Sequence, residues 1–130
     1  MSRTIIIHLS TKDVPRARAF YTALGFAVNE PMSGETHVSI DISDTIKAMF
    51  SEESVFATFS PKAVCDTSKF LEVLNCLTLD SRAEVDATIA KALGAGGTVF
   101  EEAEDHGFMY AHSFIDPDGH GWNLIHMTGE

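Results

Sequence analysis

The sequence predicts an α+β fold built from two βαβββ modules with curved, mostly antiparallel sheets. The pattern strand, helix, strand, strand, strand can be read twice along the chain. The tripeptides Ala23-Leu24-Gly25 and Ala92-Leu93-Gly94 lie about 69 residues apart, which is close to half of the 130-residue length. We therefore expect one domain over residues 1–130, with a first module at about 1–60 and a second at about 69–130.

The first half begins with Thr4–Leu9, a run of β-branched and apolar residues that predicts a strand. Asp13 is expected to cap a helix that has Pro15 in its first turn and ends at Gly25. Ser51–Phe59 is interpreted either as a short helix or as a lid-like loop. Three further strands are predicted between these segments, at Phe26–Asn29, Thr36–Asp41 and Thr45–Phe50.

The second half repeats this order. Leu71–Leu79 predicts a strand, and either Asp80 or Ser81 caps a helix whose apolar stripe continues to Gly94. Ala103–Gly107 is predicted to be an acidic, exposed loop. The remaining predicted strands are Thr98–Glu101, Met109–Ile115 and Gly121–Met127.

The charge balance restricts the possible partners. Nineteen acidic and nine basic residues give a formal net charge of −10. A nucleic-acid-binding protein needs a cationic surface, so we expect no nucleic-acid partner. No apolar run approaches the roughly 20 residues that cross a bilayer, and the N-terminal segment does not look like a signal peptide. We therefore expect a cytoplasmic protein with no membrane contact.

The remaining chemical motifs are few. Cys65 and Cys76 have no disulfide or zinc-binding pattern, and Cys76 lies in an apolar run, so we expect it to be a buried free thiol. No G-x-S-x-G, P-loop, G-x-G-x-x-G or C-x-x-C motif is present in the sequence. The sequence gives no support to the chemistries of those motifs.

Two longer motifs indicate a family. Residues 13–26 read DVPRARAFYTALGF and residues 114–122 read FIDPDGHGW. These resemble the first-helix signature and the last hairpin, F-x-D-P-D-G-H-x-W, of the glyoxalase/bleomycin-resistance/extradiol-dioxygenase (vicinal oxygen chelate) superfamily. The chain is also similar to its subgroup labelled "predicted lactoylglutathione lyase". The resemblance covers nearly the whole chain and implies the glyoxalase/bleomycin resistance fold, sheets that enclose a cavity, and a homodimer.

Enzymes of this superfamily usually bind one divalent metal through His, Glu or Gln side chains in the cavity. The resemblance places the four ligand positions at Ile6, Met49, Leu74 and Asn123. Aliphatic side chains have no lone pair for a metal, a thioether is a soft ligand, and a neutral amide is a weak one. We therefore expect no bound metal and no other cofactor.

His8 is the candidate catalytic residue if the protein is an enzyme. It lies two residues after Ile6, so strand alternation places it on the same, cavity-facing side. Its imidazole titrates near neutrality and could bind an anion or act as a general base. An equally good alternative is a buried imidazole that is satisfied by a neighbour. The predicted ligand-binding residues of this cavity are His8, Ser10, Met49, Cys76, Ser113 and Asn123.

The same alternation assigns roles to the other histidines. His112 is expected to pack toward a helix, and His126 to face away from the cavity. His120 is expected to shape its turn, and His37 and His106 to be solvated near turns.

These observations favour a metal-free protein that binds a small molecule, similar to bleomycin-resistance proteins that sequester a ligand without chemistry. The acidic charge and the cavity lining favour a cationic or aromatic ligand. The alternative is a metal-dependent lyase, isomerase or dioxygenase, such as a lactoylglutathione lyase-like enzyme. A third hypothesis is a metal-free enzyme that uses His8 as its base. The sequence leaves open whether any catalysis occurs.

Overall fold

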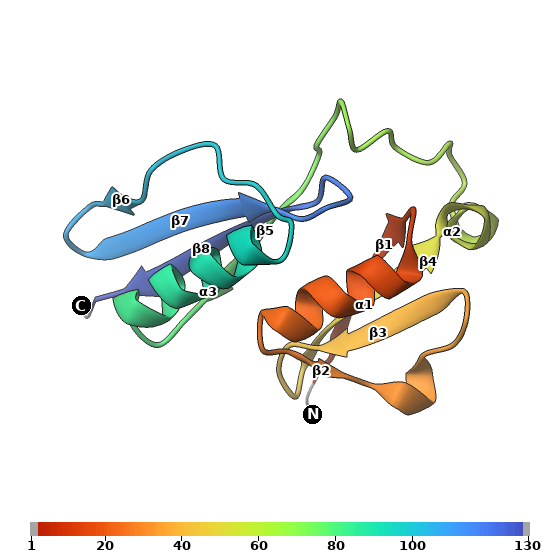
Figure 1. Ribbon diagram of the computed structural model, residues 1–130, viewed down its shortest axis with the longest axis horizontal. Helices are drawn as coiled ribbons and strands as arrows, with labels where there is room; N and C mark the ends of the chain where they lie inside the picture. Colours follow the sequence, from red (N-terminus) through yellow and green to blue (C-terminus); the bar gives the residue numbers. More distant parts are fainter. Residues whose placement is uncertain (1–2, 129–130) are drawn as a thin grey trace. The chain divides into compact units, whose positions relative to one another are not determined.

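The computed structural model describes residues 3–128. The chain divides into two compact units that meet between Asp66 and Thr67. Each unit contains one four-stranded mixed sheet, with the strand order β1-β4-β3-β2 in the first and β5-β8-β7-β6 in the second (Figure 1). This confirms the predicted α+β fold, in which two antiparallel strand pairs and one parallel pair make up each sheet.

The first unit follows the predicted order of a strand, a helix and three strands. Its first strand pairs in parallel with its last strand, which pairs antiparallel with the strand before it. Two short helices are added to this plan. The elements are β1 (Ile5–Thr11), α1 (Val14–Ala23), β2 (Ala27–Val28), η1 (Glu30–Met32), β3 (His37–Asp41), β4 (Ile46–Glu52) and α2 (Glu53–Phe59).

The helix α1 begins where the sequence predicts it. The Asp13 side chain accepts a hydrogen bond from the Arg16 backbone N–H at 3.0 Å, which satisfies one free donor of the first turn. Gly25 follows the helix with a φ of 102°, a left-handed conformation that favours glycine. The buried Tyr21 ring stacks on Phe50 of β4, with 4.6 Å between ring centroids. The helix therefore covers the face of the sheet to which Phe50 points.

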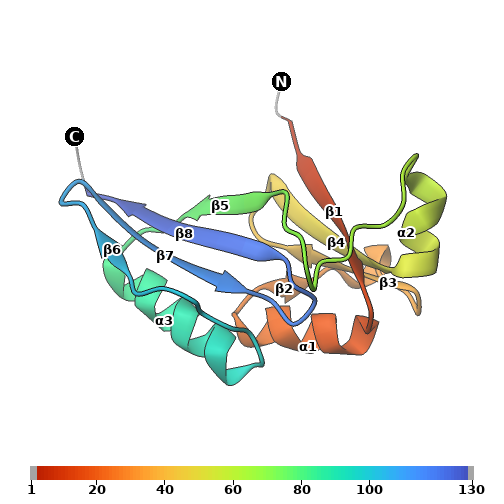
Figure 2. The same cartoon turned by 90° about the horizontal axis from the view of Figure 1, so that it is seen from above.

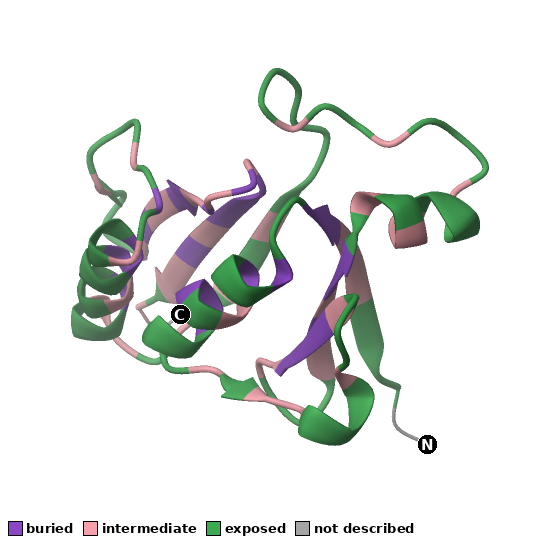
Figure 3. Cartoon of the chain, turned by 45° about the vertical axis from the view of Figure 1, so that its right-hand side comes forward, coloured by how far each residue is buried: buried purple, intermediate pink, exposed green. Residues whose placement is uncertain are grey.

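Strand pairing assigns every residue of the first sheet to one of two faces. Phe50 pairs with Val38 of β3 and with Leu9 of β1, so these side chains share the face that α1 covers. Most buried residues of the sheet point to this face by the same register. Figure 3 colours the buried stretches of the strands purple. Alternate residues point the other way, and we call that side the open face of the first sheet. It carries Ile6, His8, Ser10, His37, Ser39, Asp41, Lys47, Met49 and Ser51.

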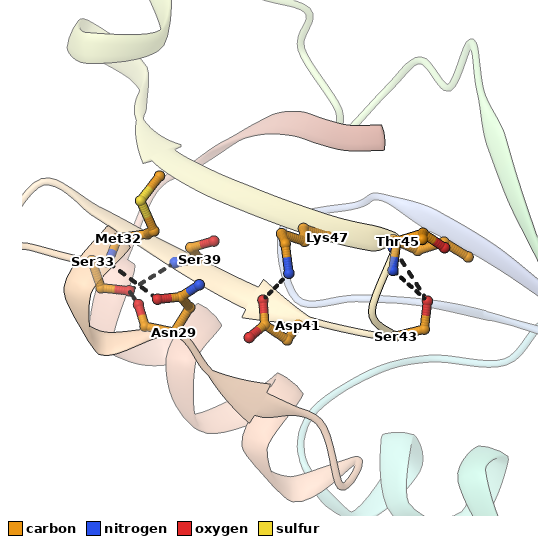
Figure 4. A network of polar contacts seen from close by, with 9 residues as sticks. Asn29, Met32, Ser33, Ser39, Asp41, Ser43, Thr45 and Lys47 are labelled. Atoms are coloured by element: carbon orange, nitrogen blue, oxygen red, sulfur yellow. Dashed lines mark hydrogen bonds and ion pairs between the residues drawn. The ribbon is translucent and has the colours of Figure 1, made fainter. Parts of the chain in front are cut away.

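Polar contacts connect the short helix η1 to the first sheet (Figure 4). The Asn29 side chain caps this helix, and the Ser33 hydroxyl donates to the Asn29 carbonyl at 2.8 Å. The same hydroxyl accepts the Ser39 backbone N–H at 2.9 Å. On the open face, the Lys47 ammonium group donates to Asp41 at 3.0 Å. These contacts hold β2, η1 and β3 together at the sheet edge.

The segment after β4 forms the helix α2, so the helical alternative for Ser51–Phe59 is the right one. It contacts both β1 and β4. Its first turn is connected to the end of β1 by an ion pair between Lys12 and Glu53, with 3.3 Å between the charged atoms. None of the helices within residues 3–128 is long and apolar enough to span a bilayer.

The second unit repeats the plan of the first. Its helix begins at Ser81, whose side chain accepts the Glu84 backbone N–H at 3.0 Å, while the Glu84 carboxylate accepts the Asp80 N–H at 2.9 Å. The cap is therefore Ser81, one of the two predicted alternatives. The elements are β5 (Leu74–Thr78), α3 (Arg82–Gly94), β6 (Glu104–Asp105), β7 (Met109–Ile115) and β8 (Gly121–Met127).

The second sheet also has a helix face and an open face, and α3 lies along the helix face (Figure 2). The Tyr110 hydroxyl donates to Asp86 of α3 at 2.6 Å, so the Tyr110 side chain points to the helix face. The pairing of Phe114 with Trp122 places both buried rings on that side. The open face of the second sheet carries Leu74, Cys76, Thr78, Glu104, Met109, Ala111, Ser113, Ile115, Gly121, Asn123, Ile125 and Met127.

The predicted strand Thr98–Glu101 is wrong. Thr98 makes one isolated bridge to Ile115, and the edge of β7 is instead paired with β6, inside the segment predicted as a loop. Gly107, with a φ of 85°, reverses the chain so that Glu104 and Asp105 return along this edge. Between the bridge at Thr98 and β6, residues 99–103 leave the edge of the sheet.

The prediction that Cys76 is buried is also wrong. Neither cysteine forms a disulfide within residues 3–128, but both are exposed. The regular strand is shorter than Leu71–Leu79 and begins at Leu74. Cys76 pairs with Asn123 on the open face, so the apolar run around it does not place its side chain in the core.

The core of the second unit gives the first testable prediction. Ile89 of α3 is 5% exposed, whereas Leu93, one turn later, is 51% exposed. Ile89→Ala should lower the free energy of unfolding by about 2–5 kcal/mol, because it leaves a cavity between α3 and the sheet. Urea denaturation followed by the fluorescence of Trp122, in the same unit, measures the change. The matched control Leu93→Ala should cost less than about 1 kcal/mol; equal losses would contradict this packing.

Candidate functional site

The open face of the first sheet centres on His8. Its Nε2 atom shares a hydrogen bond with the Oγ atom of the buried Ser51 on β4, at 2.9 Å. The rings of Phe56 and Phe59 in α2 meet the imidazole edge-on, with centroid distances of 5.0 and 5.3 Å. His8 is therefore a half-buried imidazole held between β4 and α2, as the alternative prediction of a satisfied histidine describes.

The surroundings of His8 favour its neutral form. Partial burial lowers its pKa from the ordinary value of 6.5, because a charged ring loses hydration there. The positive charge that His37 can carry lowers the pKa of His8 further. A neutral imidazole keeps a lone pair for hydrogen bonding or proton transfer. His37 is the first residue of β3, directly after the bend at residues 35–36 as predicted, and it is half-buried rather than fully solvated.

The other two predicted residues of the first unit lie on the same open face. Met49 pairs with His8 in the register of β1 and β4 and is half-buried. Ser10 lies two residues after His8 and is 7% exposed. The first unit thus brings together three of the predicted ligand-binding residues around one imidazole.

A pocket of about 250 Å³ lies in the second unit. Its base includes Ala111, Ser113 and Asn123, on the open face of the sheet. Its rim includes the bowed segment between α3 and β6. The pocket is lined by Leu74, Phe100, Glu101, Glu102, Glu104, Ala111, His112, Ser113 and Asn123.

Three acidic residues, Glu101, Glu102 and Glu104, line this pocket. Glu101 and Glu102 have no cationic partner among residues 3–128. The Glu104 carboxylate lies 3.3 Å from Nε2 of His106, an exposed pair that solvent screens. The Phe100 ring is 62% exposed beside them. This combination attracts a positive charge and offers an aromatic surface.

The base of the pocket contains a neutral polar pair. The Ser113 hydroxyl donates to the Asn123 side-chain oxygen at 3.1 Å. The Asn123 side-chain nitrogen donates weakly to the Cys76 sulfur at 3.8 Å. The structure therefore brings together the three predicted residues of the second unit, Cys76, Ser113 and Asn123, and places two of them in the pocket lining.

Two further contacts position the rim. The Arg82 guanidinium donates two hydrogen bonds to Asp105, at 2.7 and 2.8 Å, and lies 4.9 Å from the centroid of the Tyr110 ring. These hydrogen bonds hold the pKa of Asp105 below its usual range. Because neighbouring strand residues point in opposite directions, fixing Asp105 on the helix face turns Glu104 to the open face. His112 shares a hydrogen bond with the Glu101 carbonyl at 2.8 Å.

Sequence reasoning missed the rim of this pocket. The sequence places Phe100 and Glu101 in a predicted strand and Glu104 in a predicted exposed loop, and it gives Glu102 no element. The available signal was the concentration of acidic side chains directly after an aromatic residue. The prediction that His112 shares a strand face with Phe114 is confirmed by the pairing of β7 with β8. His112 also reaches the edge of the pocket.

The residues at the family's metal positions do not fit a divalent cation. Ile6 and Met49 lie on the open face of the first sheet, and Leu74 and Asn123 on that of the second. Two aliphatic side chains, a thioether and an amide offer one weak hard donor between them. Within residues 3–128, no three His, Cys, Asp or Glu side chains are grouped so that they could hold a metal ion.

Comparison with known proteins identifies the family. The model of the Glyoxalase/Bleomycin resistance protein/Dioxygenase superfamily matches residues 5–124, and the chain belongs to this superfamily. None of the curated proteins compared with the chain matches it.

Solved structures share the fold. A hypothetical protein from S. aureus is 28% identical, with a TM-score of 0.80, over 96% of this chain and 94% of that one. A glyoxalase/bleomycin resistance protein/dioxygenase family enzyme from Burkholderia phytofirmans PsJN is 18% identical, with a TM-score of 0.79, over 97% and 99% of the two chains. A glyoxalase-related enzyme from Fulvimarina pelagi is 16% identical, with a TM-score of 0.81, over 97% and 88%.

The lowered pKa of His8 predicts a pH dependence of stability. Below about pH 6.5 the unfolded chain binds a proton at this histidine that the folded chain resists, so stability should fall as the pH drops toward the folded-state pKa. His8→Gln should reduce the stability difference between about pH 7.5 and about pH 5.5, measured by urea denaturation. The neighbouring control Met49→Leu should keep the wild-type difference. An unchanged difference in His8→Gln would contradict the assignment.

Proposed function

We propose that this protein binds a small cationic molecule, which can include an aromatic group, in the pocket of the second unit. The observation that carries the proposal is a 250 Å³ pocket lined by Glu101 and Glu102, whose carboxylates have no cationic partner within residues 3–128. Because no cationic side chain neutralises these carboxylates, they can attract a bound cation. The net charge of −10 adds a field of the same sign.

The apolar part of the pocket supports an organic cation over an inorganic one. Phe100, Leu74 and Ala111 line it together with the carboxylates. An aromatic ring attracts a cation through its face and also stacks on a flat ligand. A pocket of about 250 Å³ lies just below the range of about 300–1,000 Å³ that holds drug-sized ligands. The expected ligand is therefore compact, about the size of one substituted aromatic ring.

We propose that this binding needs no metal. The donor set at Ile6, Met49, Leu74 and Asn123 supports this, because three of the four side chains offer a divalent cation no oxygen or nitrogen ligand. The alternative function, a metal-dependent lyase, isomerase or dioxygenase, requires a different donor set. A homodimer is the assembly that the family resemblance favours.

Charge recognition can be tested with benzylamine and its uncharged analogue benzyl alcohol. Benzylamine should bind and benzyl alcohol should bind far more weakly in isothermal titration calorimetry. The double variant Glu101→Gln/Glu102→Gln should weaken benzylamine binding about twofold to thirtyfold, because two exposed ion pairs at about 0.2–1 kcal/mol each contribute about 0.4–2 kcal/mol. Added salt should reduce the affinity of the wild type more than that of the double variant.

The matched control is Glu35→Gln/Glu72→Gln, which removes two exposed carboxylates outside the pocket and so the same total charge. It should leave the affinity for benzylamine within about twofold. If both double variants weaken binding equally, the net charge and not this pocket attracts the cation. If benzylamine does not bind to the wild type at all, the proposed function is wrong.

Metal binding is tested by native mass spectrometry before and after incubation with nickel, zinc, manganese and ferrous iron. The expected result is no stoichiometric metal on any species, since the donor set lacks hard ligands. The same spectra report whether the protein is a dimer. One retained metal per chain would overturn the metal-free proposal and favour the lyase or dioxygenase alternative.

A further inference from the structure

We infer that Asn123 gives the pocket a second recognition point, so that its preferred ligand is a cation with a hydrogen-bond acceptor at the opposite end. The inference rests on the proposed function, because it assigns a specificity to the same pocket. Ligands of this class include aminomethyl-substituted aryl amides and other compact amines with a distant carbonyl group.

The two ends of the Asn123 amide have different partners. The Ser113 hydroxyl donates to the side-chain oxygen of Asn123 at 3.1 Å, and the NH₂ group is the end next to Cys76. Ser113 and Asn123 face each other across β7 and β8, so the contact is short and local. The carbonyl end of the amide is thus occupied within the protein.

The NH₂ end of the amide is only weakly occupied. It carries two hydrogens, and its partner within residues 3–128 is the Cys76 sulfur, at 3.8 Å. A thiol sulfur is a weak acceptor, and it uses only one of the two N–H groups. At least one N–H of Asn123 is therefore available, and Asn123 lines the pocket. A carbonyl or other acceptor on a ligand can bind there.

The two recognition points lie at opposite ends of the pocket. Asn123 is on β8, whereas Glu104 is on β6, and β7 separates the two strands. Glu104 pairs with Ala111 and Asn123 with Ser113, so two strand spacings and an offset of two residues put their backbones about 12 Å apart. Ala111 of β7 and Phe100 provide the apolar surface along this path.

This arrangement discriminates by chemical class. An ammonium group at the Asn123 end would meet another donor, and an acceptor at the carboxylate end would meet negative charge. A cation without an acceptor leaves an N–H of Asn123 without a strong partner when it displaces water. The acceptor should therefore improve affinity about threefold to tenfold, the range that one net hydrogen bond supplies.

Three probes separate the two recognition points: para-(aminomethyl)benzamide has both groups, benzylamine only the cation, and para-methylbenzamide only the acceptor. Calorimetry should give the strongest binding for para-(aminomethyl)benzamide, followed by benzylamine, with para-methylbenzamide weakest. In ¹⁵N-resolved NMR spectra, the Asn123 side-chain NH₂ signals should shift with para-(aminomethyl)benzamide more than with benzylamine.

Two variants test the role of the amide. Asn123→Leu should abolish the advantage, bringing the ratio of the para-(aminomethyl)benzamide affinity to the benzylamine affinity down to about one. Ser113→Ala frees the amide to turn and should reduce the same advantage without removing any group that contacts a cation. Asn75→Leu, on the helix face of the same sheet, is the matched control and should keep the advantage. The NMR spectra of each variant report whether it is folded.

The outcomes distinguish this inference from the proposed function. If the two amines bind equally to the wild type, Asn123 gives no specificity, and the inference fails while cation binding stands. If para-methylbenzamide binds as well as para-(aminomethyl)benzamide, the carboxylates do not select a cation, and the proposed function fails. If neither amine binds, both fail. An advantage that persists in both Asn123→Leu and Ser113→Ala also overturns the inference.

Discussion

A helix covers one face of each sheet, and this constraint decides what every strand residue can do. Side chains that point toward α1 or α3 must fill the core, as Phe50 and Trp122 do. Their immediate neighbours point to the open face, which accepts polar side chains, including the buried Ser10, Ser39 and Ser51. The chemistry of both units therefore lies at alternate positions of strands whose other positions are fixed by the core. His8 and Asn123 are such residues.

The sequence predicts this layout well where local signals agree with long-range pairing. Asp13 and Ser81 cap their helices, and the motif at residues 114–122 forms the turn between β7 and β8, where Asp116 accepts two backbone N–H groups. The prediction fails at Thr98–Glu101, because a short apolar run does not reveal which segment occupies a sheet edge. That choice depends on the turn at Gly107, which returns another segment to the same edge.

The same distinction applies to the candidate sites. Side chains alternate between the two faces of a strand, and this local rule places His8, Ser113 and Asn123 on open faces, as predicted. The carboxylates of the pocket rim follow no such period. Glu101 and Glu102 reach the pocket through a bowed segment, which is attached to β7 by the bridge at Thr98 and by the contact of His112. Only the folded structure relates that segment to the sheet.

The division between core and open face also explains how the chain can keep the fold of its family without the family's usual metal ligands. The residues that carry the resemblance lie in caps, turns and helix-facing positions, whereas all four positions of the family's metal ligands lie on open faces. Replacing a ligand with Ile6 or Leu74 leaves the packing against α1 and α3 untouched. Each half of the chain can then change its open face independently. The first presents an imidazole beside serines, and the second presents an amide and acidic residues in one pocket.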